Sequence, residues 1–144
     1  MTVTVPLGVS LHEVLALAGG STVHPAAYID GGPMMGKLVT SLDAPVTKTT
    51  GGLIVLPEAH ILIRRRRASE RSILEMARTT CEQCLLCTEL CPRHIIGHEL
   101  PPHLIVRSVN YHHFGQPSTL LSALTCSECA ICEAWACPVD ISPM

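Results

Sequence analysis

The sequence predicts an α+β protein in which a small β-grasp-like module precedes an all-helical domain of the two-cluster ferredoxin type. Three observations predict this fold. Short apolar runs typical of strands dominate the first part of the chain, all 8 cysteines lie beyond it, and from Ser69 onward the spacing of apolar residues is helical. Because the composition changes near Arg64, we expect a β-rich module over residues 1–63, a basic linker over residues 64–71 and a helical metal-binding domain over residues 72–144.

The first module is expected to hold one helix among short strands. Ser10 and Glu13 have the spacing of a capping box, which predicts a helix start, and Gly19-Gly20 predicts its end. Its expected apolar face consists of Leu11, Val14, Leu15 and Ala18. Five segments have the β-type pattern of strands: residues 2–5, 28–30, 37–39, 45–47 and 53–56.

Four consecutive arginines, residues 64–67, separate the two modules. A solvated connector is the favoured interpretation, and a docking patch for an acidic redox partner is the alternative. Beyond them a helix is expected over residues 69–80. Pro101-Pro102 predicts a second helix, with a face formed by Leu104, Ile105, Ser108 and Val109. Ser118 is expected to cap a third, which continues through Leu120, Leu121 and Leu124.

The cysteines form two runs, Cys81-x2-Cys84-x2-Cys87-x3-Cys91-Pro92 and Cys126-x2-Cys129-x2-Cys132-x4-Cys137-Pro138. Three thiolates at this short spacing can each bind one corner of a 4Fe-4S cubane, and in two-cluster ferredoxins the cysteine before proline binds the other cluster. We therefore expect one cluster on Cys81, Cys84, Cys87 and Cys137, and a second on Cys126, Cys129, Cys132 and Cys91.

Two other uses of cysteine are less consistent with these runs. Structural zinc takes thiolates in pairs, whereas each run here carries a third cysteine at the same short step. Disulfides form in oxidising compartments, and residues 1–6 have neither the charged nor the apolar region of a secretory signal. The sequence therefore favours iron–sulfur clusters and a cytoplasmic location.

Length and charge restrict the function further. The chain has 144 residues with 1 Phe, 2 Tyr and 1 Trp, so we expect metal binding to supply much of the folding free energy of the helical part. A net charge of -2 gives no support for nucleic-acid binding. The longest apolar stretch, residues 52–57, is far shorter than the roughly 20 residues of a membrane span.

Longer motifs carry a resemblance to a known family. Asp30-Gly-Gly-Pro-Met-Met-Gly36 and Pro45-Val-Thr-Lys-Thr-Thr-Gly-Gly-Leu-Ile-Val-Leu-Pro57 resemble the soluble-ligand-binding β-grasp (SLBB) segment of the RnfC-like electron-transport family. Cys87-Thr-Glu-Leu-Cys-Pro-Arg-His-Ile-Ile-Gly-His98, Pro102-His-Leu-Ile-Val-Arg-Ser108 and Ala136-Cys-Pro138 are similar to its cobalamin-reductase branch, which belongs to propanediol-utilisation microcompartments. The x4 step before Cys137 also favours this branch over the Rnf subunit.

The resemblance implies an oxidoreductase that passes electrons from NADH through FMN and two 4Fe-4S clusters to cobalamin. The implied partners are a flavin- and NADH-binding domain or subunit and a corrinoid or adenosyltransferase acceptor, and the implied location is the lumen of a bacterial microcompartment. The family's flavin domain precedes the SLBB segment, and the chain contains no G-x-G-x-x-G motif. We therefore expect a fragment that also lacks the family's distal helices, binds no nicotinamide or flavin, and has no turnover alone.

Two alternative functions stay open: a ligand-binding or docking module whose clusters are mainly structural, and a fragment of an Rnf-type electron-transport subunit.

Single residues outside the cysteine runs also have expected roles. A turn with close backbone approach is expected at Gly31, Gly32 and Gly36, with a ligand-binding or docking loop as the alternative. Trp135 is expected to shield a cluster from water. His94 and His98, four residues apart, could present two imidazoles on one helical face, where second-sphere hydrogen bonding is the favoured role.

Overall fold

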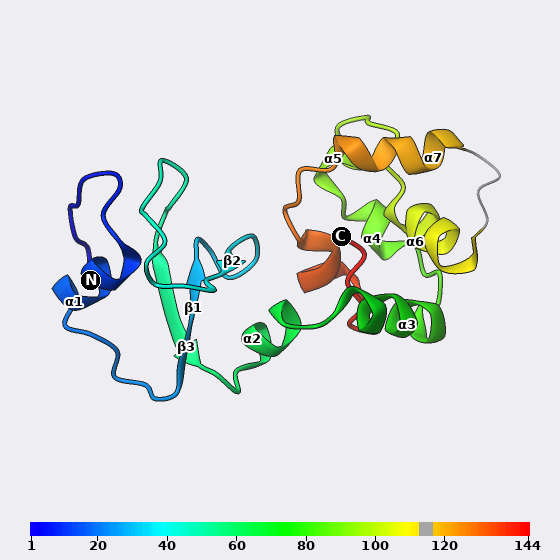
Figure 1. Cartoon of the computed structure of the whole chain (residues 1–144). Helices are drawn as coiled ribbons and strands as arrows, with labels where there is room; N and C mark the ends of the chain where they lie inside the picture. The colour runs from blue at the N-terminus through cyan, green and yellow to red at the C-terminus, as the bar shows by residue number, and fades with distance from the viewer. Residues whose placement is uncertain (113–116) are drawn as a thin grey trace. The chain divides into compact units, whose positions relative to one another are not determined.

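The computed structural model describes residues 1–112 and 117–144. The chain divides into two compact units, Met1–Ala68 and Ser69–Met144, and each is described by itself. The first unit contains a three-stranded sheet with two helices, and all named elements of the second are helical (Figure 1). The predicted α+β class is therefore confirmed.

Helix α1, Leu11–Leu17, forms where the sequence predicts it. The Ser10 hydroxyl accepts a hydrogen bond from the Glu13 amide at 3.2 Å, and the Glu13 carboxylate accepts one from the Ser10 amide at 3.1 Å. These two bonds complete the capping box. The Glu13 carboxylate accepts bonds from both the amide and the hydroxyl of Ser10, and these lower its pKa. Gly19 and Gly20 both have positive φ, 92° and 81°, a conformation that ends the helix at low steric cost.

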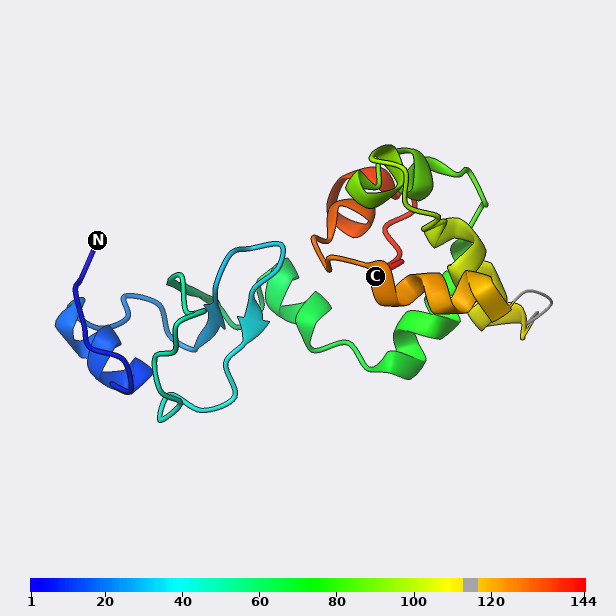
Figure 2. The ribbon, with the colours of Figure 1, turned by 90° about the horizontal axis from the view of Figure 1, so that it is seen from above.

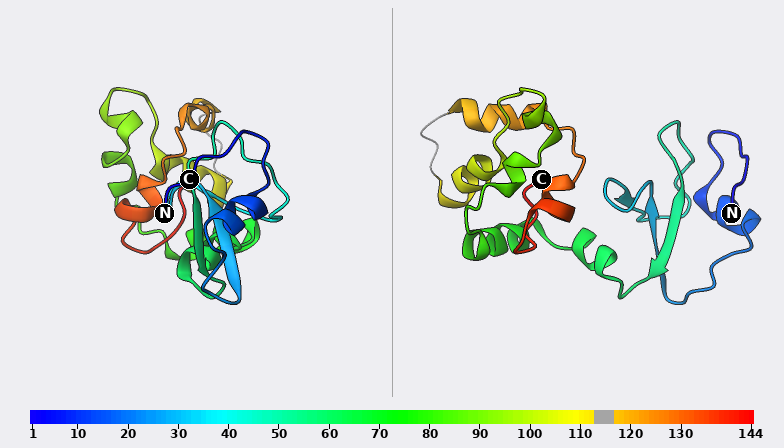
Figure 3. Two further views of the ribbon diagram at one scale, coloured as in Figure 1. Left: turned by 90° about the vertical axis from the view of Figure 1, so that its left-hand side faces the viewer. Right: turned by 180° about the vertical axis from the view of Figure 1, so that it is seen from behind.

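The sheet of the first unit is antiparallel, with β1, Ala26–Asp30, between β2, Lys37–Leu38, and β3, Leu53–Pro57. Figure 3 shows β3 running alongside β1. Ile29 in the middle of β1 is fully buried and pairs with Leu38 on one side. It forms a core with Ala27 and with Ile63 of the helix that follows the sheet.

Two predicted strands are wrong. Residues 2–5 form no strand, and residues 45–47 contribute only an isolated bridge between Pro45 and Ser10. The Val46 amide and carbonyl bond to Val9 and Gly8 at 2.7 Å and 2.9 Å, so this segment ties down the approach to α1. Alternation of residue types predicts strand conformation, but a strand also needs a partner of several residues, which the local pattern does not reveal.

The arginine segment is partly helical. Helix α2, Ile61–Arg66, buries Ile63 against the sheet, and its last turn carries Arg64, Arg65 and Arg66. Positive side chains near a helix C-terminus are favoured by the helix dipole. The Arg66 guanidinium donates a hydrogen bond to the carbonyl of Met34, which links α2 to the loop before β2. The expected linker over residues 64–71 thus contains the end of α2 and the start of the next helix.

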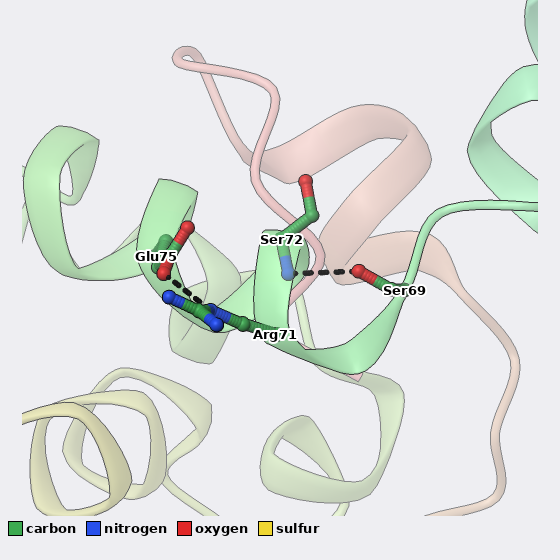
Figure 4. Close-up of polar contacts among 4 residues, drawn as sticks. All are labelled: Ser69, Arg71, Ser72 and Glu75. Atoms are coloured by element: carbon green, nitrogen blue, oxygen red, sulfur yellow. Dashed lines mark hydrogen bonds and ion pairs between the residues drawn. The ribbon is translucent and has the colours of Figure 1, made fainter.

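Helix α3, Glu70–Thr80, leads to the first cysteine run. The Ser69 hydroxyl accepts a hydrogen bond from the Ser72 amide at 3.2 Å, and Arg71 pairs with Glu75 at 2.9 Å one turn later (Figure 4). The exposed ion pair adds little stability, whereas a serine cap is typically worth about 1 kcal/mol. The cap therefore explains why the helix starts at Glu70, as the sequence predicts.

Over residues 69–112 and 117–144, the second unit has six further helical segments: α4, Leu86–Glu89; α5, Pro92–Ile95; α6, Pro102–Tyr111; α7, Pro117–Leu121; η1, Ser122–Thr125; and η2, Cys132–Ala136. Helix α6 packs against α3, α4 and α7, while η2, orange-red in Figures 1 and 2, packs against α4. The buried core of the second unit is formed by Ala77, Val106 and Ile141.

No helix within residues 1–112 and 117–144 is long and apolar enough to cross a membrane.

Two details of the predicted helices are wrong. The buried residues of α6 are Pro102, Val106 and Asn110. Of the predicted face, Ile105 and Ser108 are half-buried and Leu104 and Val109 are exposed, so that face does not form the core. Ser118 lies inside α7 and not before it, and Leu121 and Leu124 are exposed as well. Every side of these short helices carries apolar residues, so the sequence alone could not fix which side faces the core.

Candidate metal centres

The two cysteine runs have the same backbone geometry. In each run, the residue directly before the second cysteine and the residue directly after it both have positive φ. The four residues are Gln83 at 55°, Leu85 at 70°, Glu128 at 50° and Ala130 at 60°. Positive φ is uncommon outside glycine, and left-handed residues placed among right-handed ones form concave backbone nests that bind anions. Both runs are therefore shaped as anion cradles, which suits the sulfides of an iron–sulfur cluster.

A small cavity of about 20 Å³ lies beside the first run. It is lined by His103, Val106, Ile141 and four cysteines, which are Cys81, Cys84, Cys87 and Cys137. Three of these cysteines belong to the first run, and the fourth is the pre-proline cysteine of the second. The structure thus brings together all four residues expected to bind the first cluster.

A larger cavity of about 430 Å³ lies beside the second run. Its lining includes Arg93, Leu100, Ile105 and four cysteines, which are Cys126, Cys129, Cys132 and Cys91. Cys91 is buried, and it comes from the first run. The structure therefore gathers each expected set of four around its own cavity, with one thiol crossing in each direction.

Short helices position the crossing thiols. Cys91 is the N-cap of α5, and Pro92 occupies the first helical position, where its missing N–H is not needed. Helix α4 separates Cys87 from Cys91 by one turn, so these two thiols line different cavities. In the second run η2 does the same for Cys132 and Cys137.

The extra residue of the second run is taken up by a π-helix. Three residues separate Cys87 from Cys91, and four separate Cys132 from Cys137. A π-turn contains one residue more than an α-turn, and η2 is a π-helix. Ala136 within it is buried, but Trp135 is 76% exposed, so the expectation that Trp135 shields a cluster from water is wrong. The π-turn directs the indole away from the interior.

Burial and a neighbouring cysteine raise the pKa of two of the thiols, Cys87 and Cys132. Burial, with the neighbouring Cys84 as the next cause, raises the pKa of Cys87 to about 11. Burial and the neighbouring Cys126 raise the pKa of Cys132 to about 12. Metal ligands must be thiolates, so these sites become fully ionised only when a cationic centre compensates the charge. The four-thiol donor sets therefore fit the cationic core of an iron–sulfur cluster.

Hydrogen bonds to sulfur provide a second sphere. The Gln83 side-chain amide donates to the sulfur of Cys81 at 3.1 Å, and the backbone amide of Glu128 donates to the sulfur of Cys126 at 3.3 Å. Such bonds stabilise thiolates and help to set cluster potentials. In the described parts of the chain, no three His, Cys, Asp or Glu side chains are grouped closely enough to hold a single metal ion.

The glycine loop before β2 has a structural explanation. Gly31 has a φ of 102° and donates a hydrogen bond to the Gly52 carbonyl at 2.8 Å. A Cβ on Gly36 would lie 2.4 Å from the Gly32 carbonyl oxygen and 2.5 Å from a methyl carbon of Ile29, so only glycine fits there. Gly32 is exposed, with open space around it.

Sequence reasoning misplaced one pair of residues and missed another. Helix α5 ends at Ile95, and Gly97 has a φ of 98°, so His94 and His98 do not share a helical face. The missed residues are Thr88 and His103, which contact each other beside the first cavity. The signal that could have found them is the position of Thr88, directly after the third cysteine of its run.

Comparison with known proteins gives a consistent result. The 4Fe-4S dicluster domain family matches residues 80–142, which include all eight cysteines. The cobalamin reductase PduS of Salmonella typhimurium strain LT2 is 69% identical over 144 residues, all of this chain and 32% of that protein. PduS of Citrobacter freundii is 66% identical over the same shares. A component of the ion-translocating oxidoreductase complex of Methanosarcina acetivorans is 33% identical over 95 residues, 66% of this chain and 19% of that protein.

The chain spans about a third of the length of the PduS relatives that it matches. No solved structure matches it. The cysteine-containing half is therefore a 4Fe-4S dicluster domain within a segment that is similar to part of a larger oxidoreductase.

Proposed function

We propose that each of the two cavities in this chain holds one 4Fe-4S cluster. The chain belongs to the RnfC-like electron-transport family and forms an iron–sulfur electron-transfer module of it. The first set of ligands is Cys81, Cys84, Cys87 and Cys137; the second is Cys126, Cys129, Cys132 and Cys91. One observation supports this most directly: each cavity is lined by three cysteines of one run and the pre-proline cysteine of the other.

The finer proposal concerns the direction of electron flow. When bound, the clusters would supply one-electron transfer between a reduced flavin and a corrinoid, as the 69% identity to a cobalamin reductase suggests. Cys87 lies in α4 and Cys91 follows it, so one ligand of each proposed centre stands about one helical turn from a ligand of the other. Proximity between centres is what efficient electron transfer between two clusters needs, and α4 provides it.

The partners are proposed on the same basis. The longer relatives suggest that NADH and FMN bind to another domain or subunit, and that the acceptor is a corrinoid or an adenosyltransferase that carries one. The first unit would then act as the SLBB module that docks this segment onto its partners. Its Gly31, Gly32 and Gly36 loop is a candidate contact surface, supported by the exposure of Gly32. The proposed location is the cytoplasm or the microcompartment lumen.

The decisive experiment is anaerobic reconstitution of the full chain with iron and sulfide. Two cubanes require about 8 iron and about 8 sulfide per chain, with visible absorbance that bleaches on dithionite and returns on oxidation. The matched control is a chain with Cys81, Cys84 and Cys87 all replaced by serine, which should retain about half of the iron. Binding of one or two ions without sulfide would contradict the proposal.

A second candidate function is a docking module with structural clusters, favoured by a separate first unit that contains the sheet and no cysteine. Reduced chain mixed with cob(II)alamin or a corrinoid-loaded partner distinguishes the two. Reoxidation of the clusters at the expense of the corrinoid supports electron transfer, whereas clusters that stay reduced support the docking module.

A further inference from the structure

Trp135 is the only tryptophan of the chain, and 76% of it is exposed. Tryptophan is usually well buried in a folded protein, because its large ring removes much apolar surface from water. Trp135 lies in η2, between Cys132 and Cys137, and lines neither of the two cavities. The indole therefore has no part in enclosing a cluster, and its exposure beside the ligands needs another explanation.

The helix that packs against η2 also carries exposed apolar side chains. Helix α4 lies beside η2 in Figures 1 and 2, and it begins at Leu86 and ends before Leu90, both of which are exposed. Side chains four residues apart lie on the same side of a helix. Exposed apolar side chains on adjoining elements are typical of protein–protein interaction sites. Leu86, Leu90 and Trp135 are called the α4–η2 surface below.

Both elements connect the two proposed centres. Cys87 of the first set lies in α4, and Cys91 of the second set follows it. Cys132 of the second set begins η2, and Cys137 of the first set follows it. Each leucine of the α4–η2 surface directly precedes a proposed ligand. A protein that contacts this surface therefore contacts residues next to the ligands of both centres, which is where an electron has the shortest way out.

The charges around the α4–η2 surface are of one sign. The two cysteine runs contain four glutamates and no lysine, arginine or histidine. Glu89 lies in α4 and Glu133 in η2, while Glu82 and Glu128 lie between the first two cysteines of their runs. Four thiolates would give each loaded centre a further negative charge. A complementary protein therefore has an apolar contact area with lysines or arginines around it.

We propose that the α4–η2 surface is the docking site of a redox protein whose own centre lies beneath such an apolar area with a basic rim. In the docked complex one electron leaves a reduced cluster and enters the centre of the partner, and no bond is made or broken. This inference rests on the proposed function, because electrons reach the surface only from loaded clusters. A second copy of the chain is a poorer occupant, because it would place glutamates against glutamates.

The probe for the test is ferric cytochrome c, a small basic protein whose haem edge is surrounded by lysines. Titration calorimetry with the oxidised, reconstituted full chain measures binding without electron transfer. Stopped-flow mixing with the reduced chain, freed of dithionite, measures the transfer, in which one cluster electron reduces one ferric haem. Trp135→Ala should weaken binding and slow the transfer about tenfold, because tryptophans at interfaces often supply much of the binding energy.

The matched control is Leu121→Ala. Leu121 is 63% exposed, and it belongs to α7, which packs against α6 and η1. Its removal should change neither the binding nor the transfer. Ferricyanide is a small anionic oxidant that needs no docking surface, and it should oxidise the reduced Trp135→Ala chain as fast as the wild type.

Charge provides an independent arm of the test. Glu89→Lys should slow the transfer to cytochrome c several-fold and weaken its dependence on salt, because charges at the rim act on the association rate. Glu70→Lys changes the net charge equally but lies in the first turn of α3, so its effect should be smaller. Ferricyanide should oxidise the Glu89→Lys chain no more slowly than the wild type.

Equal binding and transfer for Trp135→Ala and the wild type would overturn the docking site. A chain that sediments as a dimer, which Trp135→Ala dissociates, would also overturn it, because a second copy would then occupy the surface. In both cases ferricyanide still oxidises the loaded clusters, so the proposed function stands. A wild-type chain that forms no clusters would overturn both.

Discussion

Cys91, the last cysteine of the first run, lines the same cavity as Cys126, the first cysteine of the second. Cys87, which lies in α4 four residues before Cys91, lines the other cavity. The two sets of thiols are therefore interleaved along the chain, and this interleaving makes the ligand assignment testable by single substitutions.

Replacement of Cys91 by serine should damage the second cluster and spare the first. Cys137→Ser should do the reverse, because the two residues cross in opposite directions. Iron content together with the EPR spectra of the separate clusters would measure both effects. If Cys91→Ser instead removed the signal of the cluster on Cys81, Cys84 and Cys87, each run would bind its own cluster and the crossing would be wrong.

Replacement of Trp135 by alanine should leave both cluster potentials unchanged. The indole is 76% exposed and lines neither cavity, and surface substitutions usually change the free energy of unfolding by no more than about 0.5 kcal/mol. Redox titration and thermal unfolding of the loaded chain check the two parts. A potential shifted upward by wetting of a cluster would restore the shielding role that the sequence suggested.

Gly36→Ala should destabilise the first unit by about 1 to 3 kcal/mol, the usual range for overpacking. The added methyl group would meet the Gly32 carbonyl and Ile29, the centre of the sheet. Gly32→Ala is the matched control, because no atom lies within 4 Å of the new carbon. Denaturant unfolding followed by hydrogen exchange in β1 measures both. Equal stability of the two variants would remove the steric explanation for Gly36.

Retention of iron should increase with pH between 7 and 9. The pKa values of Cys87 and Cys132, about 11 and about 12, lie above the ordinary value of 9.0, so the metal-free folded state favours the neutral thiols. Because folding raises these pKa values, the two thiols favour the folded metal-free chain over the unfolded chain fully below about pH 9, and progressively less above it. Protons therefore compete with iron more strongly as the pH falls. Competition with a chelator whose iron affinity is constant over this range would reveal it; pH-independent retention would contradict it.

Removal of iron should unfold the second unit only. The buried core of that unit consists of Ala77, Val106 and Ile141, whereas the first unit has its own core and no cysteine. Hydrogen exchange of the metal-free chain should show protection lost over residues 73–138 and kept near Leu15, Ile29 and Ile54. Uniform loss over the whole chain would mean that the two units fold as one.

Local signals in the sequence were reliable where a few neighbouring residues determine the structure. The capping box of Ser10 and Glu13 is formed by hydrogen bonds within one turn, so spacing alone reveals it, and the apolar spacing of α3 is as local. The cysteine spacing likewise predicted which thiols share a cavity, because short steps restrict the geometry.

Features that depend on tertiary packing were not predictable in the same way. The strand at residues 2–5 has no partner, the buried face of α6 centres on Val106, and Trp135 is turned outward by the π-turn. The contact between Thr88 and His103 joins α4 to α6, and no local pattern encodes it.

The interleaved thiols also have a consequence for biosynthesis. The ribosome releases Cys81, Cys84, Cys87 and Cys91 well before Cys137, so a nascent chain offers four thiols in one run before either native set is complete. A cubane captured at that stage would take Cys91 as its fourth ligand and leave Cys137, in place of Cys91, as the fourth thiol for the later run. With the proposed crossed ligands, faithful maturation would therefore require that cluster insertion wait until translation has passed Cys137.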